Sequence, residues 1–407
     1  MKRALLLLFA ALAAGCSQRS AFTVYLLTDR SEMAAYAEVF NATQRDVKVE
    51  LVYGKDPAAA VRKGGTGADV VVATGLAGAD MREHFRSVGD LFGKGRLDQG
   101  AFYKALLETG RQDNNQYLLP LSFNLPMVVF KPSALPEEAP ATYVTPEYIR
   151  ARSAEFDAQK SRIARKVGFS PLWQPAFVYY TAALDGVGFR SGDGRSVQWD
   201  DSVLEGTLNR FREWSKSLNA DDLRDFDSKY LHIPYYRLIE DGRILFYLSD
   251  SREFLAIPPE KRQNLDFRWL GEKDRIPVGE EILHAGALRG SRNPRGARRF
   301  LLWLFQPQTQ ILLMETNHFK RLPGVFGVAD GLPALAAVAE NDLPQPHHYP
   351  AFVGHIPPRD MLLGPGLLPV GWGAVRDGVV LPWLREAVVA GTAQTPLRRK
   401  LEAAGYK

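Results

Sequence analysis

Polar residues that could bind a small solute stand directly after three apolar stretches of strand length. In an open α/β sheet, ligands bind beyond the carboxyl ends of the strands, so side chains at these positions are candidate contacts. They are Thr28, Asp29, Arg30, Thr74, Gly75, Ser249 and Asp250. Their hydroxyl, carboxylate and guanidinium groups can hydrogen-bond to a polar solute. An alternative for Asp29, and for Ser31 close by, is that it caps the helix that follows.

No sequence motif of a catalytic or metal centre is present. The chain has no Gly-x-Ser-x-Gly, Gly-x-x-x-x-Gly-Lys-Ser/Thr or His-Glu-x-x-His pattern. His347, His348 and His355 could suggest a metal site, but their proline-rich context is typical of a surface loop. Tyr235 and Tyr236 could suggest an iron site, but their helical context favours core packing for one of them. We therefore expect no metal, no cofactor and no catalytic residue.

The charge distribution argues against a nucleic-acid-binding protein. The chain of 407 residues has a formal net charge of +5, and its 51 Lys and Arg are interspersed with 46 Asp and Glu. This length suggests two or three domains, and a hydrophobic fraction of 46% suffices for a large core. The single cysteine excludes an intramolecular disulfide.

The candidate residues need a sheet to position them, and the hydrophobic pattern predicts one. Strands are expected at 22–27, 47–53, 68–74, 115–121, 126–131, 243–249 and 282–290. Helices are expected at 31–43, 56–65, 146–165, 174–185, 201–218, 293–305, 307–315 and 379–391. The alternation of strands and helices in the N-terminal part favours βαβ units and a parallel sheet.

The N-terminal residues resemble a lipoprotein signal. Lys2 and Arg3 precede an apolar run at 4–14, which is shorter than the about 20 residues that cross a bilayer. The sequence Ala-Ala-Gly-Cys that ends at Cys16 resembles a bacterial lipobox, which implies cleavage before Cys16 and lipid on its sulfur. Residues 1–15 would then be the signal and 16–21 a tether to the membrane. The alternative is a plain secretory signal with a chance cysteine.

Five stretches, in the same order along the chain, resemble the family 1 extracellular solute-binding proteins of ABC importers, the family that includes the maltose-binding protein. They are ADVVVAT (68–74), YLLPLSFNLPMVVFKPSAL (117–135), IEDGRILFYLSDS (239–251), GALRGSRNPRGARRFLLWLFQPQTQILLME (286–315) and VGWGAVRDGVVLPWLREAVVAGTAQTPLRRKLEAAG (370–405). Residues 132–170 and the histidine-rich segment 340–360 have no clear counterpart in that family.

The resemblance implies the type II periplasmic-binding-protein fold. This is a two-lobe α/β fold in which each lobe is a mostly parallel sheet flanked by helices, with three hinge crossings between them. Lobe 1 would comprise 22–121 and 285–318, and lobe 2 would comprise 125–283 and 322–407. The crossings are expected near Ser122–Leu125, Glu281–His284 and Thr316–Arg321. Ligand would bind in the interlobe cleft, and the lobes would close around it.

The same resemblance implies further ligand contacts in that cleft. They are Asn124, Trp173, Gln174, Phe177, Arg252 and Trp372. The face of a tryptophan matches the apolar face of a sugar ring, and amide and carboxylate groups match its hydroxyls. At Arg252, sugar-binding relatives commonly have an aromatic residue. The alternatives are core packing for Trp173 and Trp372, and a strand-end hydrogen bond for Asn124.

Together these features predict a lipid-anchored, monomeric, extracytoplasmic protein that captures a carbohydrate and delivers it to the permease subunits of an ABC importer. Arg30, Arg252 and Arg321 keep an anionic solute, a uronate or a sugar phosphate, as an alternative. A secreted carbohydrate-active enzyme is another, and it would need two carboxyl groups about 5 to 9.5 Å apart. A third is a protein of the same fold that has lost transport and binds a partner.

Overall fold

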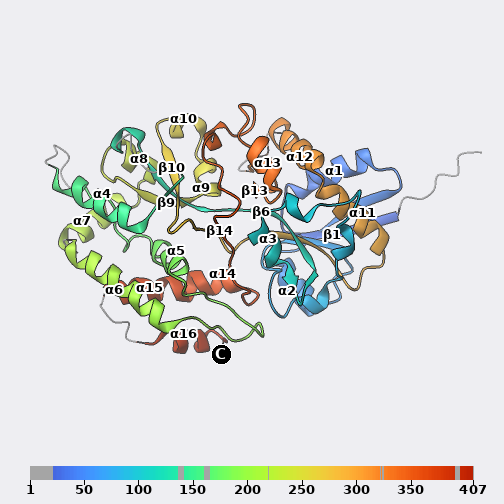
Figure 1. Ribbon diagram of the computed structural model, residues 1–407, viewed down its shortest axis with the longest axis horizontal. Coiled ribbons are helices and arrows are strands. Elements are labelled where there is room, and N and C mark those ends of the chain that lie inside the picture. Colours follow the sequence, from blue (N-terminus) through green and yellow to red (C-terminus); the bar gives the residue numbers. More distant parts are fainter. Residues whose placement is uncertain are drawn as a thin grey trace, which may run out of the picture.

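The computed structural model describes residues 22–135, 142–159, 166–218, 220–320, 322, 325–389 and 395–406. These residues form two lobes that lie side by side along the long axis of the molecule (Figure 1). We call the lobe that is built on the larger sheet the first lobe and the other the second lobe. The predicted two-lobe α/β fold is confirmed.

The first lobe is built on a six-stranded sheet with the order β13-β6-β12-β3-β1-β2. Its strands are β1 (Phe22–Thr28), β2 (Val47–Tyr53), β3 (Val70–Ala73), β6 (Leu118–Phe123), β12 (Leu283–Ala287) and β13 (Leu332–Pro333). Every residue of β3 is buried, as its uninterrupted β-branched run predicts. β1 pairs in parallel with β2 and with β3.

The prediction of mostly parallel sheets is wrong. In the first lobe, β12 runs antiparallel to both of its neighbours, β3 and β6, and β13 runs antiparallel to β6. The reason is the path of the chain. β6 leads out of the first lobe and β12 leads back into it, so the two strands run in opposite directions and need no βαβ crossover.

Helices flank the first sheet and bury their apolar faces against it. They are α1 (Met33–Thr43), α2 (Pro57–Lys63), α3 (Lys104–Thr109), α11 (Pro294–Leu304), α12 (Pro307–Phe319) and α13 (Ala336–Asn341). α11 begins where its sequence predicts, because the Asn293 side chain accepts a hydrogen bond from the Gly296 N–H and Pro294 occupies the first turn. The Phe40 ring of α1 contacts the Phe300 ring of α11, with 5.3 Å between centroids. A short hairpin, β4 (Arg111–Gln112) and β5 (Asn115–Gln116), lies nearby in the chain.

The second lobe is built on a four-stranded sheet with the order β8-β10-β7-β9. Its strands are β7 (Pro126–Phe130), β8 (Tyr143–Val144), β9 (Tyr247–Asp250) and β10 (Asp266–Leu270). Its helices are α4 (Pro146–Ala158), α5 (Pro175–Asp185), α6 (Asp201–Ser217), α7 (Ala220–Tyr230), α8 (Tyr235–Glu240), α9 (Ser251–Ala256), α10 (Pro259–Arg262), α14 (Trp372–Val375), α15 (Leu381–Val389) and α16 (Leu397–Ala403). This sheet is also mixed, because β7 runs antiparallel to β9 and β10 while β8 runs parallel to β10.

The chain passes between the sheets inside two of the stretches where crossings are predicted. Asn124 and Leu125 join β6 to β7, and residues 278–282 join β11 (Ile276–Pro277) to β12. The third predicted crossing, near Thr316–Arg321, is wrong for those of its residues that the structure describes. There α12 continues to Phe319, while Arg321 lies outside the described residues.

The third passage instead follows β13, whose pairing with β6 places residues 332–333 in the first lobe. The predicted boundary that assigns 322–407 to the second lobe therefore begins too early. After β13 the chain reaches β14 (Leu362–Leu363), which pairs with β11, and then enters α14 through residues 364–371. Along this path the Trp269 indole Nε1 of β10 donates to the His355 carbonyl at 2.7 Å, so the histidine-rich segment packs against the second lobe.

The predicted signal and tether, including Cys16, lie outside the described residues. Within the described part of the chain, no helix combines the length and the apolar character needed to cross a membrane.

Candidate functional site

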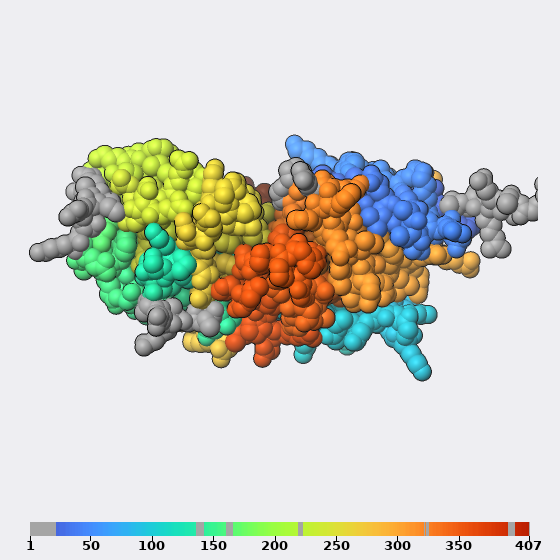
Figure 2. All heavy atoms as spheres, turned by 90° about the horizontal axis from the view of Figure 1, so that it is seen from above, coloured from blue at the N-terminus to red at the C-terminus, as the bar shows by residue number. Residues whose placement is uncertain are grey.

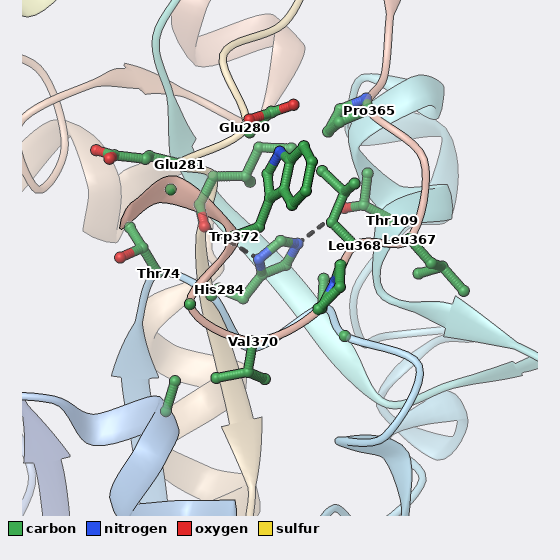
Figure 3. A pocket seen from close by; sticks show the side chains of 18 of the residues that line it. Thr74, Thr109, Glu280, Glu281, His284, Pro365, Leu367, Leu368, Val370 and Trp372 are labelled. Atoms are coloured by element: carbon green, nitrogen blue, oxygen red, sulfur yellow. Dashed lines mark hydrogen bonds between the residues drawn. The ribbon is translucent and has the colours of Figure 1, made fainter. Parts of the chain in front are cut away.

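A pocket of about 220 Å³, which we call the main pocket because of its position, lies between the two lobes (Figure 3). On the first-lobe side it is lined by Thr74 and Gly75, which follow β3, and by Thr109 at the end of α3. The passage at 280–284 and the segment 365–374, which leads into α14, complete its walls. The pocket therefore lies at the carboxyl edge of β3, where α/β sheets place their ligands.

A second pocket, of about 150 Å³, shares two residues, Glu280 and Glu281, with the main pocket. We call it the charged pocket. Its other lining residues are Asn124, Leu125, Tyr180, Asp250, Arg252, Gly279 and Arg376. They come from both β6–β7 and β11–β12 passages and from the second lobe, so the two pockets are neighbouring parts of one interlobe site.

Glu280 is the most deeply held carboxylate of this site, with a side chain only 11% exposed. It accepts a hydrogen bond from the Tyr179 hydroxyl, and its Oε2 lies 3.2 Å from Nη1 of Arg376. The Trp372 indole Nε1 in turn donates to the Tyr179 oxygen at 3.3 Å. Burial raises the pKa of Glu280, while the hydrogen bond from Tyr179 and the charge of Arg376 oppose that rise. A carboxylate has about four acceptor positions, so this fixed group retains acceptors for ligand hydroxyls.

The arginines of the charged pocket are committed to carboxylates. Arg252 Nε of α9 lies 2.8 Å from Oδ2 of Asp330, which precedes β13 of the first lobe, so this ion pair joins the lobes. Arg252 Nη1 also lies 3.7 Å from Glu281 Oε2. Burial raises the pKa of Asp330 to about 6, and the charge of Arg252 opposes that rise. Arg376 pairs with Glu280 and with Asp377. Neither guanidinium is left over for an anionic ligand.

The charge of the main pocket also disfavours an anion. Three carboxylates line it, those of Asp56, Glu280 and Glu281, and none of the described residues in its lining is a lysine or an arginine. The carboxylate of an incoming uronate would meet like charge there, whereas the hydroxyls of a neutral sugar can donate to these oxygens.

A neutral histidine lies in the wall of the main pocket. His284, at the start of β12, is 2% exposed, and burial lowers its pKa to about 4. Its Nε2 lies 2.8 Å from Thr109 Oγ1 and its Nδ1 lies 3.1 Å from the Ile282 carbonyl oxygen, and Figure 3 shows both contacts. The imidazole thus links the passage at 280–284 to α3 and adds no charge at neutral pH.

The structure brings together six of the residues predicted for the site. Thr74, Gly75 and Trp372 line the main pocket, and Asn124, Asp250 and Arg252 line the charged pocket. Trp372 also packs against the Phe189 ring, as its core-packing alternative predicts. Asn124 accepts a hydrogen bond from Ser251 Oγ at 2.6 Å and donates to the Asp330 carbonyl at 3.2 Å, which ties the first passage to both lobes.

The three predicted residues at the end of β1, Thr28, Asp29 and Arg30, line neither pocket. Thr28 is buried, and its Oγ1 accepts a hydrogen bond from the Arg30 N–H at 3.1 Å. Arg30 Nε lies 3.6 Å from Asp29 Oδ1. The capping alternative for Asp29 and Ser31 is not seen either, because the residue before α1 is Glu32 and no side chain caps the helix.

Four predicted contacts in the second lobe have structural roles. Phe177 has no exposed side chain and packs against Phe169, Phe211 and Trp214, so it belongs to the core rather than to the pocket. Trp173 stacks on Phe226 with 5.0 Å between ring centroids and lines neither pocket.

The other two are held by backbone and side-chain hydrogen bonds. The Gln174 amide bonds both the N–H and the carbonyl of Leu248, at 2.7 and 2.6 Å. Ser249 is buried, and its Oγ contacts the Tyr235 hydroxyl at 3.2 Å. Tyr235 stacks on Tyr247 with 4.1 Å between centroids, and its neighbour Tyr236 is partly buried. No group of three or more potential metal ligands occurs among the described residues.

Sequence reasoning missed several residues of the site, among them Glu280, Tyr180 and Arg376. A signal for the first was present, because Glu280 and Glu281 form an acidic pair immediately before a predicted crossing strand. Tyr180 lies on α5 beside the core residue Tyr179, and helical spacing alone does not show which of two adjacent tyrosines faces a cleft.

Comparisons with known proteins agree on the fold. No protein-family model matches the sequence, and the curated proteins yield no match either. Among solved structures, the sugar-binding protein MalE from the phytopathogen Xanthomonas citri has a TM-score of 0.66 at 14% identity, over 94% of this chain and 96% of that chain.

Two further structures have similar scores. The cyclic alpha-maltosyl-1,6-maltose binding protein from Arthrobacter globiformis has a TM-score of 0.59 at 15% identity, over 95% of this chain and 97% of that one. CpMnBP1, solved with mannotriose bound, has a TM-score of 0.60 at 12% identity, over 94% and 99%. The chain therefore has the same two-lobe fold as these three binding proteins.

Proposed function

We propose that this protein is an extracytoplasmic solute-binding protein that captures a neutral sugar between its lobes and delivers it to the permease subunits of an ABC importer. The observation that carries the proposal is the interlobe site. Its main pocket is lined by three carboxylates, which suit sugar hydroxyls, and by Trp372, which suits the apolar part of a sugar. Proteins of the same fold are described as sugar-binding.

The anionic alternative has less support from the described residues. Arg252 and Arg376 line the charged pocket, but each is already paired with carboxylates. A uronate or a sugar phosphate would have to displace these pairs. The protein is proposed to act as a binding protein and not as an enzyme, since proteins of the same fold are described as sugar-binding or substrate-binding.

The lipid anchor belongs to the same proposal. The lipobox at Cys16 would hold the monomeric protein at the extracytoplasmic face of a membrane, close to its permease. Attachment by one end would leave the interlobe site free to open and close.

A thermal-shift screen of the purified protein tests the function. The panel contains neutral mono- and oligosaccharides, uronates, sugar phosphates and amino acids. A ligand at about 100 times its Kd should add about 2.7 kcal/mol to the free energy of unfolding. Stabilisation by a neutral sugar, confirmed by calorimetry, supports the proposal. Stabilisation only by the anionic or amino-acid members would contradict it.

A further inference from the structure

A surface rich in arginine lies at the end of the first lobe. We call it the terminal arginine surface, and its members are Arg86, Arg289, Arg292, Arg295, Arg298 and Arg299. Two of them are neutralised, since Arg298 pairs with Asp90 and Arg299 Nη1 lies 3.0 Å from Asp46 Oδ2. The other four are exposed, and none of them has an ion pair with a described residue. The Glu83 carboxylate, whose Oε1 lies 3.9 Å from His84 Nε2, lines a surface pocket of about 320 Å³ together with Arg289.

This surface lies close to Phe22, the first described residue of the chain. The Asn293 amide donates to the Thr23 carbonyl at 3.1 Å, which places the start of α11 beside the start of β1. The Phe22 N–H donates to the Asp46 carbonyl, and Arg86 donates to the Arg289 carbonyl at 2.8 Å. Figure 2 shows the blue residues of β1 and β2 beside the orange residues of α11 at one end of the molecule. The interlobe site lies at the opposite ends of β1 and β3.

The distance to the proposed anchor is short. Five residues separate Cys16 from Phe22, and a fully extended chain of this length spans at most about 20 Å. Phe22 itself is 70% exposed. If Cys16 carries lipid, as the proposed function assumes, the terminal arginine surface is held within reach of the headgroups.

We propose that the terminal arginine surface binds the anionic phospholipid headgroups of the membrane that holds the anchor. Each basic residue near an anionic surface adds about 1 kcal/mol, which corresponds to about a fivefold gain in partition. The attraction acts over about 8 Å at physiological salt, so it requires the close approach that the short tether enforces. The contact places the terminal arginine surface of the first lobe against the membrane. The interlobe site then faces away from the bilayer.

Vesicle partitioning tests this surface without a sugar. The full chain carries Cys16→Ser, so that lipid on the cysteine contributes nothing. Its partition coefficient is measured on vesicles of phosphatidylcholine alone and on vesicles that also contain phosphatidylglycerol. The apolar residues 4–14 are present in every variant and meet both vesicle types, so the ratio of the two coefficients reports the charge effect.

The test variant replaces Arg86, Arg289, Arg292 and Arg295 with glutamine. The matched control replaces Arg190, Arg195, Arg385 and Arg399, four exposed arginines of the second lobe without ion pairs to described residues. A third variant replaces the first four with lysine, which retains the charge. Circular dichroism melts check that each variant is folded.

We expect the glutamine variant to lose at least about tenfold in the ratio, from the roughly fivefold effect of each arginine that reaches the surface. The lysine variant and the second-lobe control should retain the ratio, and added salt should lower it. An unchanged ratio in the glutamine variant, or an equal loss in the second-lobe control, would overturn the proposal. Palmitate labelling of the wild-type chain tests separately whether Cys16 carries lipid, and the sugar screen tests which solute binds. A negative result for the arginine surface can therefore be distinguished from a failure of the proposed function.

Discussion

Replacing His284 with glutamine removes a buried imidazole from the wall of the main pocket. Burial lowers the pKa of His284 from 6.5 to about 4, so in the window between these values the unfolded chain binds a proton that the folded protein does not. The contribution of the neutral imidazole to the free energy of unfolding is therefore present in full above about pH 6.5. It is lost as the pH falls towards about 4. The loss amounts to about 2 kcal/mol at about pH 5 and about 3 kcal/mol at about pH 4.

Two other buried groups act in the opposite sense in the same window. Burial raises the pKa of Asp157 and of Asp330 to about 6. Between about pH 4 and 6 the folded protein therefore binds more protons at these carboxyls than the unfolded chain does. Their contribution to stability is present at low pH and is lost as the pH rises through 6. The wild-type profile mixes both effects, but the difference between wild type and His284→Gln isolates the imidazole.

Urea denaturation between about pH 7.5 and about pH 4 measures this difference. The substitution should lower the free energy of unfolding most at neutral pH, and this cost should shrink by about 3 kcal/mol towards pH 4. The control is His347→Gln, on an exposed loop, for which we expect little change at either end. A cost of His284→Gln that is the same at every pH would refute the argument that this imidazole is held neutral by burial.

Four further outcomes are expected. Phe177→Ala should lower the free energy of unfolding by about 3 to 5 kcal/mol in urea denaturation while ligand affinity stays unchanged, since the ring lies in the core. Trp173→Ala should also cost about 3 kcal/mol of stability, and a loss of affinity in calorimetry at unchanged stability would show that the indole contacts ligand. Glu280→Gln should weaken sugar binding by about 1.5 to 3 kcal/mol, whereas Asp377→Asn, which contacts the same Arg376 guanidinium but lines neither pocket, should not. Cys16→Ser should abolish palmitate labelling and release the protein from membranes, and label retained in this variant would exclude the anchor.

The fold was predictable because its strands and helices have strong hydrophobic patterns. The buried run of β3 and the capped start of α11 both lie where the sequence predicts them. The third passage between the lobes was not predictable in this way. β13 has only two residues, Leu332 and Pro333, too short a segment for any periodicity, and its place in the sheet depends on pairing with β6.

Strand ends placed some of the predicted residues at the pockets, whereas Thr28 at the end of β1 lines neither pocket. Thr74 follows β3 into the main pocket, and Asp250 ends β9 at the charged pocket. Residues on helices were harder, because the rotation of a helix decides which side chains face the cleft. Phe177 on α5 faces the core, while Tyr180, three residues later, lines the charged pocket. Glu280 lies in a segment with no regular period, and its role depends on contacts with distant residues such as Arg376.

The position of β12 has a consequence for how the chain is made. This strand fills the place between β3 and β6, so the first sheet has a gap at its centre until residue 287 has left the ribosome. Throughout synthesis of the second lobe, β3 and β6 lack the strand that joins them, although β1, β2 and β3 can already pair. A nascent chain in this condition remains unfolded for longer than one built from local contacts. If the protein is threaded through a secretion channel as an extended chain, as the proposed function requires, such a delay is an advantage, since folding is completed only after its late strands have followed.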